Sequence, residues 1–168
     1  MKEYTHVTHP FDPIFDRSSE ILILGSFPSV KSREVNFYYG HKNNRFWKVM
    51  EEIYHWEEMD TIERKKEFLL RKHIAIWDVI ESCDIVGSSD SSIKNVVPAD
   101  LSRVIENSRT ERISCNGKTA GRLFMKYQQA DIACTVLPST SSANAAYSLK
   151  DLIREWSVLL DEKRLNIQ

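Results

Sequence analysis

Short apolar runs alternate with helical apolar periods along most of the chain, and this alternation restricts the fold more than any other feature. Four apolar runs are typical of buried strands, at residues 21–24, 74–77, 112–115 and 132–137. Apolar residues at helical spacing lie between or after them, at 46–54, 98–105, 120–127 and 149–160, and Pro98 is placed at a helix start. Strands that alternate with helices predict a parallel sheet covered on both faces. We therefore expect an α/β fold, a three-layer α/β/α sandwich around a central, mostly parallel four-stranded sheet.

Length and composition predict a single domain over residues 1–168, because 42% of the residues are apolar and no Ser/Gly/Pro-rich linker divides the chain. The longest uncharged stretch, 132–149, is rich in Ser, Thr, Asn and Pro, so we expect no membrane-spanning helix. The N-terminus has no apolar secretory segment. Cys83, Cys115 and Cys134 form no CxxC pair, which argues against a disulfide scaffold, a zinc site or an iron–sulfur site. These features favour a cytoplasmic protein without a metal or cofactor.

Functional sites in parallel sheets form where the strands end, and three segments follow strand ends here: 25–47, 116–119 and 138–144. The second segment, Asn-Gly-Lys-Thr, has the last residues of a phosphate-binding P-loop. That motif needs a glycine five residues before its final glycine, and Arg112 stands there instead. Gly117 is therefore interpreted as a tight strand-to-helix turn.

The first segment combines positive charge with aromatic side chains. Residues 31–48 contain five basic residues and one glutamate, a net charge of +4, so the rest of the chain carries −5. Five aromatic residues interleave with these charges, at positions 37, 38, 39, 46 and 47. Cations that meet phosphates, beside aromatic faces that stack on bases, are typical of a nucleic-acid site. The alternative is a solvated loop with aromatics packed beneath it.

The last segment, 138–148, places five hydroxyl side chains before a helix. Hydroxyls and backbone amides at such a position can hold a phosphate. The alternative is a helix cap, in which one serine satisfies free amides and the others are solvated.

Taken together, the segments resemble the uracil-DNA glycosylase superfamily, in order and over most of the chain. GSFPS (25–29) resembles the glycine-rich first loop of the mismatch-specific enzymes, YGHKNNRFWK (39–48) resembles their aromatic block, and VLPSTS (136–141) resembles their second motif. Phe27 occupies the position of the catalytic asparagine in the mismatch branch. The combination instead resembles the hypoxanthine-DNA (DNA-deoxyinosine) glycosylases, whose catalytic asparagine comes from the aromatic block.

The resemblance implies roles for individual residues. The catalytic asparagine maps to Asn44, with Asn43 as its rival because Lys-Asn-Asn replaces Pro-Arg-Asn, and His41 either donates to the base or fixes the loop. Ala143 stands where relatives carry a leucine wedge. The residues expected in the base pocket are Ser26, Phe27 and Tyr39, with Tyr39 stacking on the base. The residues expected to contact DNA are Pro28, Ser29, Lys42, Lys118, Ser139, Thr140 and Ser141.

The resemblance also implies an activity. A monomeric, monofunctional DNA glycosylase would flip a deaminated base, hypoxanthine first, out of DNA and hydrolyse its N-glycosidic bond in base excision repair, without a cofactor. Two alternatives stay open: a uracil or mismatch-type glycosylase of the same fold, and a non-catalytic nucleic-acid-binding module. Four residues outside the three segments are expected to have structural roles: His73, Trp77, Asp78 and Trp156.

Overall fold

A parallel sheet of four strands forms the centre of the molecule, as predicted. The computed structural model describes residues 3–127 and 130–160. The strand order is β3 (Ile74–Asp78), β2 (Ile21–Gly25), β6 (Arg112–Asn116) and β7 (Cys134–Leu137). Every residue of β3 is buried, as are four of the five in β2. Strands covered on both faces are continuous apolar runs, and the sequence shows such runs here.

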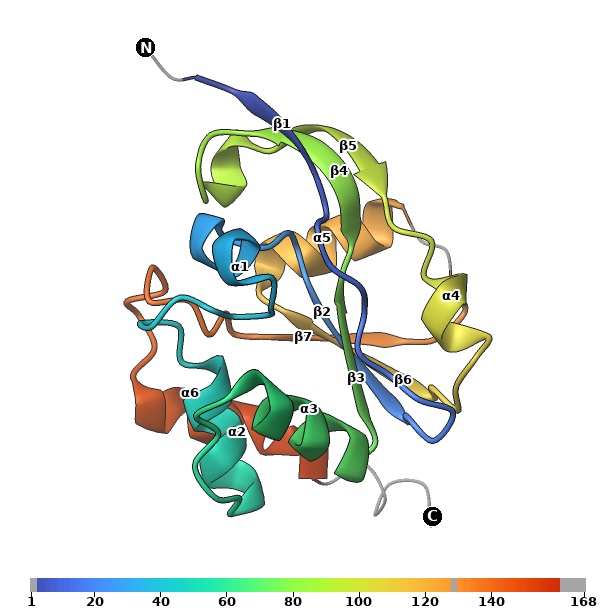
Figure 1. Cartoon of the computed structure of the whole chain (residues 1–168), viewed down its shortest axis with the longest axis vertical. Helices are drawn as coiled ribbons and strands as arrows, with labels where there is room; N and C mark the ends of the chain where they lie inside the picture. Colours follow the sequence, from blue (N-terminus) through green and yellow to red (C-terminus); the bar gives the residue numbers. More distant parts are fainter. Residues whose placement is uncertain (1–2, 128–129, 161–168) are drawn as a thin grey trace.

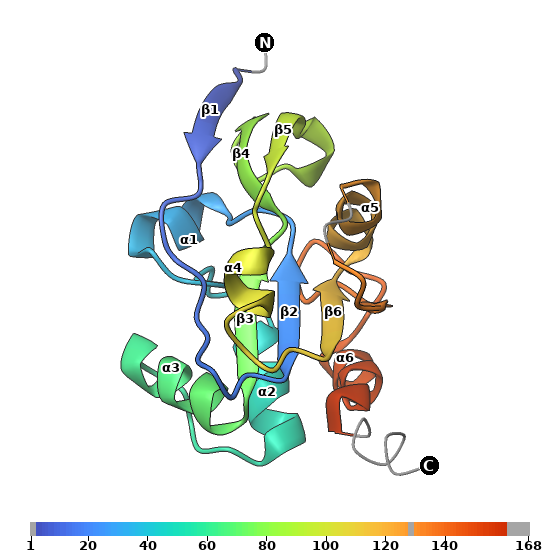
Figure 2. The ribbon, with the colours of Figure 1, turned by 90° about the vertical axis from the view of Figure 1, so that its right-hand side faces the viewer.

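Helices cover both sides of this sheet. Helix α5 (Lys118–Lys126) packs on β6 and β7, and α6 (Leu149–Trp156) lies on the opposite side, where it contacts α2 (Phe46–Tyr54). In Figure 1, α5 lies above β7 and α6 lies below it, and Figure 2 shows the two helices near opposite ends of β6. Helix α3 (Ile62–Arg71) packs on β3, and the short helices α1 (Val30–Val35) and α4 (Ser102–Ile105) lie in connections. The three-layer prediction is confirmed.

A second, antiparallel sheet was not predicted. It has the order β1 (Thr5–Thr8), β4 (Ile80–Ile85) and β5 (Lys94–Pro98). The predicted helix start at Pro98 is wrong, because Pro98 ends β5 and pairs with Ile80, and helix α4 begins only at Ser102. Proline is tolerated in an edge strand such as β5, since the missing N–H leaves no central ladder bond unmade.

Strands β3 and β4 join the two sheets with one residue between them. Asp78 is the last residue of β3, and β4 begins at Ile80. Across this junction the Val79 amide donates to the Gly25 carbonyl at 2.9 Å, and the Ile80 amide donates to the Ser26 carbonyl at 3.2 Å. The carboxyl end of β2 is therefore fixed against the junction of the two sheets.

The core supports the prediction that Trp77 and Trp156 are structural, because both are buried. The Trp156 indole donates to the Pro138 carbonyl at 2.9 Å and so holds the start of the last loop. Helix α6 begins with a capping box between Ser148 and Asp151, as the capping interpretation of one serine in this segment predicts. Within the described residues, no helix is long and apolar enough to cross a membrane.

Candidate active site

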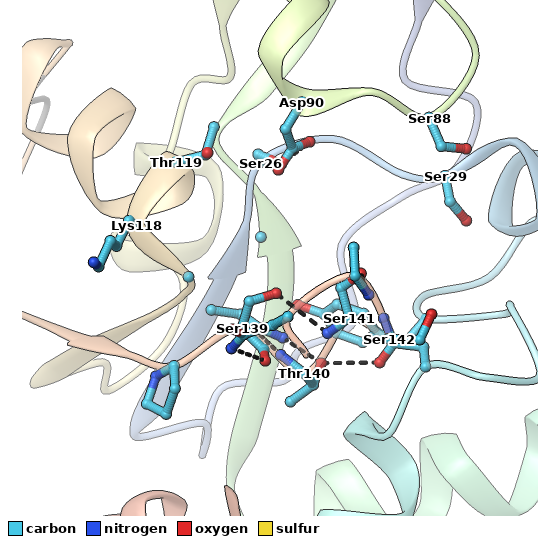
Figure 3. A pocket seen from close by; sticks show the side chains of 18 of the residues that line it. Ser26, Ser29, Ser88, Asp90, Lys118, Thr119, Ser139, Thr140, Ser141 and Ser142 are labelled. Carbon is cyan, nitrogen blue, oxygen red and sulfur yellow. Dashed lines mark hydrogen bonds between the residues drawn. The ribbon is translucent and has the colours of Figure 1, made fainter. Parts of the chain in front are cut away.

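A cleft of about 1070 Å³ opens at the carboxyl ends of the parallel strands. It lies between the loop after β2, the loop after β4, the start of α5 and the loop after β7. Figure 3 shows Ser139–Ser142 on one side of the cleft, facing Ser26 and Asp90 on the other. The predicted site residues that line it are Ser26, Phe27, Pro28, Ser29, Tyr39, His41, Asn44, Lys118, Ser139, Thr140 and Ser141. The three segments recognised in the sequence thus form one site.

Asn44 enters the cleft with its side-chain oxygen already bound. Its Oδ1 accepts from the Phe46 amide at 2.9 Å and from the Thr140 hydroxyl at 2.9 Å. The Thr140 hydroxyl in turn accepts from Asn116 Nδ2 at 3.0 Å, and Asn116 Oδ1 accepts from the Thr140 amide at 3.0 Å. Because Asn116 donates to the hydroxyl, the hydroxyl proton points to Asn44. Within residues 3–127 and 130–160, no side-chain hydrogen bond uses the Asn44 amide nitrogen, so it remains as a donor.

The position of Thr140 does not fit the expectation that its side chain contacts DNA. Its exposed fraction is 0%, and its hydroxyl both accepts from Asn116 and donates to Asn44. Its side chain is therefore not available to a phosphate. Instead, its hydroxyl donates a hydrogen bond to the side-chain oxygen of Asn44 and so holds that side chain in place.

The rival residue and the histidine occupy the loop above Asn44. Asn43 is exposed, and its amide donates to His41 Nδ1 at 3.0 Å. His41 lines the cleft, whereas neither Asn43 nor Lys42 is among the lining residues. This placement favours Asn44 over Asn43, and it gives His41 a bond that fixes the loop.

Tyr39 lines the cleft with one face of its ring covered. The ring stacks on Phe46 with centroids 4.3 Å apart, and the residue has a left-handed backbone with φ of 53°. Burial, and next the charge of Asp78, raise the pKa of its hydroxyl far above the ordinary range of tyrosine. The hydroxyl is therefore neutral at any physiological pH.

Arg45 fixes the last loop of the cleft. Its guanidinium donates to the carbonyls of Ser141 at 2.8 Å and Asn144 at 3.1 Å, and also to those of Thr140 and Tyr147. Its backbone amide donates to the Thr140 carbonyl at 3.0 Å. One side chain thus holds the loop that carries Thr140 in place.

These elements match one known family. The profile of the Uracil DNA glycosylase superfamily covers residues 13–159, which include both sides of the cleft and the whole parallel sheet. The chain belongs to the uracil-DNA glycosylase superfamily.

Individual members of the superfamily are similar to the chain along nearly its full length. A protein of Methanosarcina acetivorans named hypoxanthine DNA glycosylase is 34% identical over 151 residues, covering 89% of this chain and 95% of the relative. A protein of the same name from Methanosarcina barkeri is 31% identical over 150 residues, covering 88% and 94%. The solution NMR structure of a candidate uracil DNA glycosylase from M. acetivorans superposes with a TM-score of 0.78, at 32% identity, over 92% of this chain and 96% of that chain.

Several lining residues of this superfamily member were not predicted from the sequence. Asn116 ends β6 and binds Thr140, and Asp78 ends β3 inside the cleft. The loop after β4 adds Asp90, whose Oδ1 accepts from the Ser26 hydroxyl at 3.1 Å. Burial raises the pKa of Asp90, the bond from Ser26 opposes that increase, and the charge of Asp78 adds to it. The charge of Asp78 thus acts on a second carboxyl group in the wall of the cleft.

Most cations of the basic segment already have a partner within the protein. Lys31 lies 3.7 Å from Glu34, and Lys48 lies within 4 Å of two glutamates of its own helix. Arg33 donates to the Gly87 carbonyl at 2.8 Å, and Arg45 binds carbonyls as described above. Of the five cations, Lys42 alone has no such partner among the described residues.

The remaining predicted DNA contacts line the cleft from loops and from the start of α5. Ser139 Oγ accepts from the Ser141 amide at 3.2 Å, and Ser141 Oγ accepts from the Ala143 amide at 3.1 Å, so each oxygen has one local bond and a hydroxyl proton left to donate. Ser29 caps α1 by accepting from the Ser32 amide at 3.1 Å. Lys118 is exposed at the first turn of α5.

Proposed function

We propose that the chain is a monofunctional DNA glycosylase that removes deaminated bases, hypoxanthine first, by hydrolysis of the N-glycosidic bond. The observation that carries this proposal is the Asn44 amide, which is held in the cleft by Thr140 and Asn116 with its nitrogen left to donate. The names of the two Methanosarcina relatives support hypoxanthine as the base.

Cleavage of an N-glycosidic bond builds negative charge on the leaving base and positive charge on the sugar. A flipped base enters the cleft at a cost of about a few kcal/mol, which is smallest for a poorly paired base. Donors aimed at the leaving base lower the barrier, since they bind it more strongly in the transition state than in the ground state. The Asn44 carbonyl is engaged by Thr140 and Phe46, so Asn44 acts through its amide nitrogen rather than by orienting water with its oxygen.

The direct test is single-turnover cleavage of end-labelled duplexes that carry one deoxyinosine or one deoxyuridine. We expect faster strand breakage at deoxyinosine, and only after treatment with alkali. Breakage without alkali would contradict a monofunctional mechanism. Preferred breakage at deoxyuridine would favour a uracil glycosylase of the same fold, and binding without any cleavage would favour a non-catalytic module.

Thr140 gives a prediction about the support of Asn44. Thr140→Val removes the hydroxyl that orients the Asn44 amide, and it leaves Asn116 Nδ2 without its acceptor. We expect the single-turnover rate on deoxyinosine to fall about 10–100-fold, with a loss of about 1–3 kcal/mol in the free energy of unfolding. Thr140→Ser keeps the hydroxyl and should recover most of the rate. Equal rates in Thr140→Val and the unmodified protein would contradict this role.

Lys118 gives a prediction about DNA affinity. It lies at the edge of the cleft, and no ion pair engages it within residues 3–127 and 130–160. Lys118→Ala should weaken duplex binding for every sequence alike and reduce the slope of log K against log salt by about 1. Titration of a labelled duplex at several salt concentrations measures this slope. An unchanged slope would show that Lys118 does not contact a phosphate.

We also propose that the protein acts as a monomer in the cytoplasm. The support is the odd number of cysteines and the absence of a CxxC pair in the sequence, which favour a reducing compartment. Light scattering of the purified protein, with and without a lesion duplex, tests the oligomeric state.

A further inference from the structure

Two thiols lie in contact on neighbouring strands of the parallel sheet. The Sγ atom of Cys115, on β6, lies 2.8 Å from the Sγ atom of Cys134, on β7, and both cysteines are free. In the register of these strands Cys115 lies opposite Val136, two residues beyond Cys134, so the thiols are diagonal neighbours. Residues two apart on a strand share a face of the sheet, which places both thiols on the same face. Neither cysteine lines the cleft.

The separation of the two sulfur atoms brings a covalent bond within reach. A disulfide bond is about 2.05 Å long, so a movement of less than about 1 Å would close it. The absence of a CxxC pair argued against a disulfide scaffold, but Cys115 and Cys134 are 19 residues apart and strand pairing brings them together. The sheet thus holds a dithiol that the spacing in the sequence does not reveal.

The two thiols differ in exposure and in acidity. Cys115 is 0% exposed, whereas Cys134 is partly exposed at the start of β7, an edge strand. The hydrogen bond from the Cys115 thiol lowers the pKa of Cys134, and burial opposes this decrease. The same hydrogen bond, together with burial, raises the pKa of Cys115. Because the thiolate is the nucleophile, Cys134 is the thiol that reacts first with a solute, and Cys115 is held beside it as a thiol.

We propose that Cys115 and Cys134 form a reversible oxidation site, at which a hydroperoxide converts the two thiols into a disulfide between β6 and β7. The Cys134 sulfur attacks the peroxide, so that an S–O bond forms, the O–O bond breaks, and the other oxygen leaves as water or an alcohol. The Cys115 sulfur then attacks the Cys134 sulfur. The S–S bond forms, the S–O bond breaks, and hydroxide leaves with the Cys115 proton as water. The two thiols together lose two electrons and two protons.

The contact between the thiols determines how far the oxidation goes. A sulfenic acid without a neighbouring thiol is oxidised further to sulfinic and sulfonic acids, which thiol reductants do not reverse. With Cys115 in contact, the sulfenic acid on Cys134 is converted to a disulfide instead, and a thiol reductant restores both cysteines. This inference is independent of the proposed glycosylase function, because it requires no DNA and no catalytic residue.

Peptide mapping of the unmodified protein tests the proposal directly. The folded chain is treated with hydrogen peroxide, denatured, alkylated with N-ethylmaleimide and digested with trypsin. We expect a disulfide between the tryptic peptides 113–118 and 127–150, and one alkylated cysteine, Cys83, in place of three. Cys83 is 0% exposed on β4, and burial raises its pKa to about 11. The disulfide should therefore form at least about tenfold faster than Cys83 is modified, and dithiothreitol should reverse it.

Three variants separate the roles of the cysteines. Cys115→Ala should leave the sulfenic acid on Cys134, where dimedone traps it, and longer treatment should give the sulfinic acid. Cys134→Ser should leave Cys115 as a thiol, since Cys115 is buried. Cys83→Ala is the matched control, and its disulfide should form at the rate of the unmodified protein.

Several results would overturn the proposal. One is recovery of Cys115 and Cys134 as alkylated thiols at a peroxide dose that oxidises Cys83. Another is a disulfide that joins two chains, which a non-reducing gel shows as a dimer. Loss of Cys115 in Cys134→Ser as fast as in the unmodified protein would contradict the role of Cys134 as the first thiol to react. If a variant does not fold, the peptide map of the unmodified protein still decides whether the site exists.

Discussion

Replacement of Asn44 by alanine should lower the single-turnover rate of base excision by about 10²–10³-fold. Thr140 and Phe46 bind the side-chain oxygen of Asn44, which lines the cleft, so the amide nitrogen is the atom that we propose as the donor. Under the proposed mechanism, its removal would take away stabilisation of the transition state and would leave the contacts to the DNA backbone in place. Duplex affinity should therefore stay within about threefold of its original value. Rapid-quench assays on a deoxyinosine duplex give the rate, and fluorescence anisotropy gives the affinity.

Asn44→Asp separates the donor from the scaffold. An aspartate retains an oxygen that can accept from Thr140 and Phe46, but it replaces the amide nitrogen by a second oxygen. We expect it to lose as much activity as Asn44→Ala. Asn43→Ala is the matched control, since Asn43 is exposed and outside the cleft, and its rate should change less than about threefold. A reversed result, with Asn43 essential and Asn44 dispensable, would exchange the two roles.

Arg45→Ala should produce the largest loss of stability. The guanidinium donates to four carbonyls of the loop after β7, and hydrogen bonds from a charged group contribute more than neutral ones. Because the bonds share one side chain, their contributions do not add fully. We expect a decrease of about 3 kcal/mol in the free energy of unfolding, which lowers the Tm by about 6–12 °C in a domain of this size. Differential scanning calorimetry measures both quantities.

Arg71→Ala is the control for loss of an arginine. Arg71 is exposed on α3 and forms an i,i+4 pair with Glu67 at 3.2 Å. Exposed pairs contribute little, so its Tm should fall by less than about 2 °C. Arg45→Lys should be intermediate, because a single ammonium does not span four carbonyls. A Tm unaffected by Arg45→Ala would show that the loop is held by other contacts, such as the Trp156 bond to Pro138.

The parts of the fold that could be predicted are those in which local sequence determines burial. The runs 21–24 and 74–77 are apolar throughout, and a strand inside a parallel sheet needs such a run. Strands β4 and β5 contain charged and polar residues because one side of the antiparallel sheet is solvated, and their pattern is correspondingly weak. The pairing of β4 with β1 also joins segments that are far apart in the sequence, since Thr5 lies opposite Ile85. Helix α3 was likewise missed, although Thr61 caps it.

In the candidate site, too, features that depend on local sequence could be predicted, whereas features that depend on contacts between distant residues could not. Motif resemblance brought together three loops that the structure places around one cleft. It could not show that Asp78 lies in the cleft with its carboxylate bound by His9, because the two residues are 69 positions apart in the sequence. The motif also could not show that Thr140 is buried and hydrogen-bonded to Asn44 and Asn116, whereas the neighbouring Ser139 and Ser141 are partly exposed. The charge of Arg45 was counted toward DNA binding, yet loop carbonyls engage it.

The short junction between β3 and β4 has a consequence for how the molecule can accommodate DNA. With a single residue between the strands, and with the Val79 amide bonded to the Gly25 carbonyl, the two sheets lack a hinge at which they could rotate apart. Closure around a lesion must therefore come from displacement of the loops at the rim, while the inner end of the cleft keeps one shape. Under the proposed function, a base of the wrong shape would meet a rigid pocket there, and its rejection would require no conformational change.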